Sequence, residues 1–98
     1  MKLITKDIAD KLAKNVGDGF VDKPYLKLFN PVGAGTWLIT EYDPETGRMF
    51  GLCDLGYPEL GYVNLKELED LELPFGCKIE RDIYWTPEKT LAEYAGIA

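Results

Sequence analysis

Two apolar segments on either side of a short turn constrain the fold most strongly. Residues 36–42 and 48–54 flank residues 43–47, which begin with Asp-Pro and end with glycine, as hairpin loops often do. Placing Tyr42 opposite Arg48 puts apolar side chains on both faces of the hairpin. The register then pairs Trp37 with Cys53, Leu38 with Leu52, Ile39 with Gly51, Thr40 with Phe50, and Glu41 with Met49. We therefore expect a central hairpin, covered by a helix on one face and by another element or a partner on the other.

Alternating segments outside the hairpin predict further strands. Residues 25–29 alternate after Pro24, and residues 78–85 alternate between Ile79, Arg81, Ile83, Trp85 and the intervening polar residues. Residues 55–63 predict a turn followed by a short strand.

An N-terminal helix is predicted over about residues 6–15. Thr5 is typical of a helix N-cap, and Ile8, Leu12 and Val16 follow at helical spacing. The helix should therefore pack one apolar side against the sheet.

Two shorter helices are predicted in the second half of the chain. Asn64, with Glu67 three residues later, resembles a capping-box start, and Pro74 should stop that helix. Its apolar face would carry Leu65, Leu68 and Leu71. Thr86-Pro87 predicts an N-cap followed by proline at the first helical position, with Leu91 and Tyr94 facing inward before Gly96.

Together these elements predict a single α+β domain spanning residues 1–98. We expect an antiparallel sheet of four to five strands, with N-terminal and C-terminal helices and a short acidic helix. A chain of 98 residues with 46% hydrophobic residues is long and apolar enough to form one modest core.

The absence of two residue types excludes several kinds of catalysis. The sequence contains no histidine and no serine, which rules out serine triads, histidine bases and histidine-bearing zinc sites. Cys53 and Cys77 lie apart without a Cys-x-x-Cys pair, so both are predicted to be reduced thiols. Leu52 and Asp54 beside Cys53 should raise its pKa. We expect no cofactor, because Gly33-Ala34-Gly35 lacks the lysine of a phosphate-binding loop.

Charge is distributed unevenly along the chain. The net charge is −6, yet residues 1–30 carry six lysines against four aspartates. Residues 41–72 carry nine carboxylates against only Arg48 and Lys66. If these carboxylates gather on one side of the fold, that side should repel nucleic acid and attract a protein partner with a basic surface.

This reasoning favours a binding protein over an enzyme. The candidate partner-binding residues are the acidic residues of the hairpin and the following segments, together with one aromatic residue: Glu41, Asp43, Glu45, Glu59, Glu67, Glu69, Asp70, Glu72 and Trp37. An exposed aromatic residue beside such a surface would be a natural binding hot spot. Acidity that serves solubility alone is the simpler reading of the same residues.

A carboxylate-based metal-dependent enzyme or metal-binding domain is the alternative. Glu41, Asp43 and Glu45 alternate along the chain and could point the same way, and Glu80 and Asp82 have the same spacing. The segment lacks the glycine of a calcium loop, and a solvated acidic turn has the same pattern.

Nucleic-acid binding and membrane insertion are not expected. The lysines of the first helix have no interleaved aromatic residues, and the overall charge opposes DNA. No apolar run approaches the roughly 18 residues of a membrane span, and the N-terminus lacks a signal-peptide pattern, so we expect a cytoplasmic protein.

The chain also resembles a small bacterial family of unknown function found on phages, plasmids and integrative elements. The resemblance lies in residues 2–5, 40–44 with 50–52, 59–62 with 65–69, and 79–84, and it fits residues 17–35 least well. It implies no activity or site residue. It implies a setting, that of a mobile-element accessory protein of the kind that sometimes counters host defence.

Overall fold

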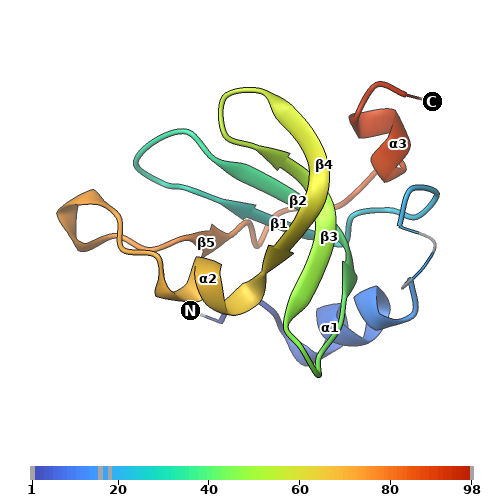
Figure 1. Ribbon diagram of the computed structural model, residues 1–98, viewed down its shortest axis with the longest axis horizontal. Coiled ribbons are helices and arrows are strands. Elements are labelled where there is room, and N and C mark those ends of the chain that lie inside the picture. Colours follow the sequence, from blue (N-terminus) through green and yellow to red (C-terminus); the bar gives the residue numbers. More distant parts are fainter. Residues whose placement is uncertain (1, 16, 18, 98) are drawn as a thin grey trace.

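The computed structural model describes residues 2–15, 17 and 19–97, and one antiparallel sheet organises them (Figure 1). Its strand order is β4-β3-β2-β1-β5. The strands are β1 (Leu26–Phe29), β2 (Thr36–Tyr42), β3 (Arg48–Asp54), β4 (Pro58–Asn64) and β5 (Glu80–Arg81). The helices are α1 (Lys6–Ala13), α2 (Leu65–Asp70) and α3 (Leu91–Tyr94), with a 3-10 turn η1 (Pro74–Gly76). This arrangement confirms the predicted α+β class and the internal position of the β2–β3 hairpin.

Two hydrophobic clusters form because alternate residues of β2 and β3 point to opposite faces of the sheet. Leu12 of α1 and Leu68 of α2 belong to the larger cluster, which also contains Leu3, Leu26, Leu28, Trp37, Ile39, Met49 and Ile79. The smaller cluster joins Leu91 of α3 to Phe50 and Leu52, with Leu38, Leu60, Tyr94 and Ala95 around them. Elements of the chain itself therefore pack on both faces of the hairpin.

A β-bulge at Thr40 changes the predicted register of the hairpin. The pairs from Trp37–Cys53 to Ile39–Gly51 are confirmed, but beyond the bulge Glu41 pairs with Phe50 and Tyr42 with Met49. The predicted pairs Thr40–Phe50, Glu41–Met49 and Tyr42–Arg48 are therefore wrong. The extra residue lets Thr40 be fully buried while its Oγ1 lies 3.5 Å from the Phe50 carbonyl oxygen, to which it donates.

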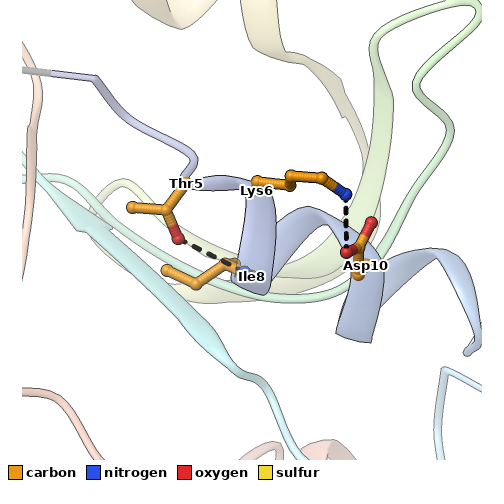
Figure 2. A network of polar contacts seen from close by, with 4 residues as sticks. All are labelled: Thr5, Lys6, Ile8 and Asp10. Carbon is orange, nitrogen blue, oxygen red and sulfur yellow. Dashed lines mark hydrogen bonds and ion pairs between the residues drawn. The ribbon is translucent and has the colours of Figure 1, made fainter.

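The N-terminal helix begins as predicted. Thr5 is its N-cap, and the Thr5 hydroxyl accepts a hydrogen bond from the Ile8 amide at 3.3 Å, as Figure 2 shows. Lys6 and Asp10 form an ion pair at 3.1 Å on the exposed side (Figure 2). The helix ends at Ala13, two residues before the predicted end, and Val16 lies outside the described residues.

The C-terminal helix begins later than predicted. Thr90, and not Thr86, is its N-cap, because Thr90 and Glu93 exchange two hydrogen bonds of 3.2 and 3.0 Å. Hydrogen bonds from the Thr90 amide and hydroxyl to the Glu93 carboxylate hold the pKa of that carboxyl below its usual value. Leu91 is fully buried, as predicted.

The last strand is much shorter than the predicted segment 78–85. Only Glu80 and Arg81 pair with β1, because Asp82 starts a turn in which its side chain accepts a hydrogen bond from the Tyr84 amide at 3.0 Å. Ile83 and Tyr84 are exposed as a result. The acidic helix likewise ends early, at Asp70, which leaves Leu71 outside it.

The η1 turn holds an exposed aromatic residue in a left-handed conformation. Phe75 has a φ of 64° and is 94% exposed. Backbone hydrogen bonds from Leu73 to Cys77 (3.0 Å) and from Cys77 to Pro74 (3.2 Å) hold this geometry. A left-handed conformation costs a non-glycine residue about 1–2 kcal/mol.

Phe75→Gly is therefore expected to stabilise the protein slightly. Removing the strain outweighs the added flexibility of the unfolded chain by about 0.5–1 kcal/mol, which should raise the Tm by roughly 2–8 °C. Phe75→Ala is the matched control, because it removes the same ring and keeps the strain. A Phe75→Gly protein that melts no higher than Phe75→Ala would contradict this account.

Candidate functional groove

A groove lies where the β2–β3 loop, the end of β4 and the start of α2 meet. Its volume is about 450 Å³, and its lining residues are Asp43, Thr46, Arg48, Tyr62, Val63, Asn64 and Glu67. We call it the 43–67 groove. It combines two carboxylates, one guanidinium group, one aromatic ring and several neutral polar groups.

Asn64 joins the two walls of the 43–67 groove. Its side-chain amide donates to the Thr46 carbonyl oxygen at 3.1 Å, and its side-chain oxygen accepts from the Lys66 amide at 2.9 Å as the N-cap of α2. The Leu65 amide also donates to the Gly47 carbonyl oxygen at 2.8 Å. The residue that starts α2 therefore also fixes the hairpin loop against it.

The aromatic part of the groove is Tyr62. This residue is 61% exposed, with the Arg48 guanidinium group 4.6 Å from the ring centroid and the Phe50 ring centroid 5.1 Å away. Arg48 therefore lies against an aromatic ring, where a cation–π contact stabilises it. An incoming side chain would still find most of the tyrosine accessible.

Two of the predicted carboxylates line this groove, and a third belongs to its loop. Asp43 and Glu67 line it from the loop and from α2. Glu45 is exposed in the same loop, where its amide donates to Asp43 Oδ1 at 2.9 Å. Of the expected acidic surface, the fold therefore brings together Asp43 and Glu45 from the loop and Glu67 from α2.

The other carboxylates of α2 have different surroundings. Asp70 forms an ion pair with Lys66 at 3.1 Å. Glu69 lies on the other flank of the helix, in shallow depressions shared with Lys2 and Lys78. Glu72 is exposed beyond the end of the helix. Lys2 and Lys78 therefore offset part of the negative charge on this flank.

Glu41 holds a distant loop in place. Its two carboxylate oxygens accept hydrogen bonds from the Gly17 and Gly19 amides, each at 3.1 Å. The loop passes so close that a Cβ atom on Gly19 would lie 2.3 Å from Glu41 Oε2. This carboxylate, predicted to bind a partner or a metal, thus has a structural role in the described part of the chain.

Glu59 and Trp37 lie away from the groove. Glu59 is opposite Cys53 near the start of β4, five residues before Asn64 and therefore roughly 17 Å along the strand. Burial raises the pKa of the Cys53 thiol, and the Glu59 charge raises it further; the predicted direction is correct, but not the predicted neighbours. Trp37 is only 5% exposed and belongs to the larger core cluster.

The described residues do not assemble a metal site. No three Asp, Glu or Cys side chains among residues 2–15, 17 and 19–97 are grouped to hold an ion. Of the alternative set, Glu41 binds backbone amides and Asp82 lies 3.7 Å from the Lys27 ammonium group. Cys53 and Cys77 are both free thiols, as predicted.

The sequence did not point to Arg48 and Thr46 as groove residues. Tyr62 takes the place of the exposed aromatic residue that was expected beside an acidic surface. Asn64 was recognised only as a helix cap. The available signal was the order of the strands along the chain. Strand β4 follows β3 after a short turn and runs back beside it, so its last residue, 64, lies next to residue 47 of the hairpin loop.

The fold and the groove define a small α+β domain with a preformed acidic and aromatic surface groove. None of its described helices has the length and apolar character needed to cross a membrane. The chain belongs to the family described as "protein of unknown function (DUF2958)", whose profile matches residues 3–98. The predicted membership of a family of unknown function is thereby confirmed, whereas its setting on phages, plasmids and integrative elements stays a prediction. No curated protein and no solved structure matches the sequence.

Proposed function

We propose that this protein is a protein-binding module that holds a basic segment of its partner in the 43–67 groove. The observation that carries this proposal is the position of the Asp43 and Glu67 carboxylates on two walls around the exposed Tyr62 ring. Carboxylates accept hydrogen bonds from arginine or lysine, and a tyrosine ring packs against their aliphatic stems or cationic heads. The groove therefore suits a basic side chain.

The charge balance of the surroundings supports a cationic ligand. The groove has two carboxylates, Asp43 and Glu67, against the single positive charge of Arg48, and the neighbouring Lys66 is paired with Asp70. With a net charge of −6, the protein attracts a basic partner at long range and repels nucleic acid.

An inhibitor is the more specific form of this function. In it, the acidic groove competes for the basic surface of a nucleic-acid-handling or host-defence protein, and the protein acts in the cytoplasm as an accessory of a mobile element. The carboxylates of the groove would compete with nucleic acid by imitating the charge of phosphate groups. Because Glu41, Glu59 and Glu69 lie away from the groove, this imitation is limited to the immediate surroundings of the groove.

The test is the binding of a fluorescein-labelled octa-arginine peptide, followed by fluorescence polarisation at low and at 0.5 M salt. The double variant Asp43→Asn/Glu67→Gln should bind roughly five- to tenfold more weakly at low salt, because each exposed ion pair contributes about 0.2–1 kcal/mol. High salt should weaken wild-type binding, since it screens exposed charges.

Asp54→Asn/Glu88→Gln is the matched control. It removes the same charge at the end of β3 and in the segment before α3, and neither residue lines the groove. Equal losses in the two double variants would show that only net charge matters and would contradict binding in the groove. A labelled DNA duplex should not bind to either protein.

A further inference from the structure

Strand β4 forms one edge of the sheet, and its outward backbone groups can be identified from the ladder. The Asp43 amide donates to the Arg48 carbonyl oxygen at 2.9 Å, so the polar backbone groups of Arg48 point toward β2. The Leu65 amide donates to Gly47, so the backbone groups of Leu65 point toward β3. The side to which the backbone N–H and C=O groups point alternates from residue to residue along a strand. The backbone groups of Glu59, Gly61 and Val63 therefore also point toward β3.

The N–H and C=O groups of Leu60 and Tyr62 therefore point away from the sheet. Within the described part of the chain, no strand pairs with β4 on this side, and the turn and loop hydrogen bonds do not involve these four groups. Helix α2, which follows β4, packs toward the larger core cluster through Leu68. An edge with free donors and acceptors is a template for another strand.

The side chains and charges along this edge indicate which strand would fit. Leu60 and Tyr62 are partly or largely exposed on one face. Carboxylates stand at both ends, with Glu59 at the start of β4 and Glu67 with Asp43 beyond its end. An antiparallel strand would place one residue opposite Asn64, on the side of the groove, and another opposite Glu59.

We propose that the partner's basic segment binds in an extended conformation as a sixth, antiparallel strand on β4. Its two ends carry basic residues, one at the 43–67 groove and one beside Glu59, and apolar residues lie next to Leu60 and Tyr62. This inference rests on the proposed function and adds the backbone conformation of the bound segment. Strand addition supplies main-chain hydrogen bonds, while the carboxylates at the two ends select the charge of the ligand.

The probe is the capped peptide Arg-Thr-Val-Thr-Val-Lys, whose residues face positions 64 to 59 in this register. Leu60→Pro removes one outward N–H without touching the bonds to β3, and proline is tolerated at such edge positions. We expect the variant to bind the peptide about tenfold more weakly, whereas Leu60→Ala, which keeps the N–H, should lose about threefold or less. Thermal melts of both variants check that the fold is retained.

A second version of the test leaves the protein unchanged. N-methylation of the two valines blocks the peptide groups that face Leu60 and Tyr62, and should reduce affinity about tenfold or more. N-methylation of the two threonines should have little effect. Equal effects of the two modifications would overturn the strand model.

The remaining outcomes separate this inference from the proposed function. In one outcome, the affinity for octa-arginine depends on Asp43 and Glu67, but the affinity for the extended peptide is unchanged by Leu60→Pro and by N-methylation of the valines. Strand addition is then wrong, and the groove proposal stands. If neither peptide binds, both are wrong. Sedimentation equilibrium of the protein alone tests a further outcome. If it shows a dimer that Leu60→Pro dissociates, β4 pairs with a second copy of this chain, and the proposal that it binds a basic segment of a partner is wrong.

Discussion

Gly51→Ala is expected to destabilise the protein by about 3 kcal/mol or more, a large part of the roughly 5–15 kcal/mol that holds a domain folded. A Cβ atom on Gly51 would lie 2.0 Å from the Leu38 carbonyl oxygen and 2.9 Å from the Ile39 Cα. Both atoms belong to the backbone of β2, the middle strand, so no side-chain rotation can relieve the overlap. Urea denaturation followed by circular dichroism measures the loss.

Gly61→Ala is the matched control for this substitution. Gly61 lies directly opposite Gly51 in the β3–β4 ladder, but a Cβ atom there would meet no heavy atom within 4 Å apart from those of Gly61 and its two chain neighbours. The change should therefore remain within about 0.5 kcal/mol of wild type. Equal destabilisation by the two substitutions would mean that glycine is needed for backbone conformation and not for close strand approach.

Leu91→Ala is expected to cost about 2–5 kcal/mol, the range for truncating a fully buried leucine. Leu91 has no exposed surface and, with Phe50 and Leu52, forms the smaller core cluster. Helix α3 has only four residues, too few to be stable alone, so its position depends on this contact. Urea denaturation gives the free energy of unfolding.

The same substitution should also loosen residues 20–22. The Leu91 amide donates to the Asp22 carbonyl oxygen at 2.9 Å, and the Ala92 amide donates to that of Phe20 at 3.1 Å. Hydrogen exchange should therefore become faster for both α3 amides. Leu71→Ala, at a leucine that is 42% exposed, serves as the control and should cost less than about 1 kcal/mol. Similar costs for the two leucines would contradict the role of Leu91 as the anchor of α3.

Local patterns predicted the elements whose causes are local. The alternation and turn residues of the β2–β3 hairpin, the Thr5 cap and the Asn64 cap all act within a few residues of themselves. The Thr40 bulge could not be read in this way, because Glu41 beyond it binds Gly17 and Gly19, more than twenty residues earlier. Long-range contacts of this kind have no signature in local spacing.

The candidate site was predictable only in part for the same reason. Asp43 and Glu67 were selected because they are acidic, and the fold does bring them to one groove. Acidity alone could not separate them from Glu41, which has a structural role, or from Asp70, which pairs with Lys66. Alternation predicted an extended segment over residues 78–85, but the side chain of Asp82 turns the chain after two residues of pairing.

Asn64 both caps α2 and binds the hairpin loop, and this has a consequence for how specifically a ligand is recognised. Since one amide side chain fastens loop and helix together, the spacing between the opposing carboxylates is set before any encounter. Little conformational entropy then remains to be lost on docking. Recognition would approach a lock-and-key process, selective for ligands of matching width and poorly adaptable to others.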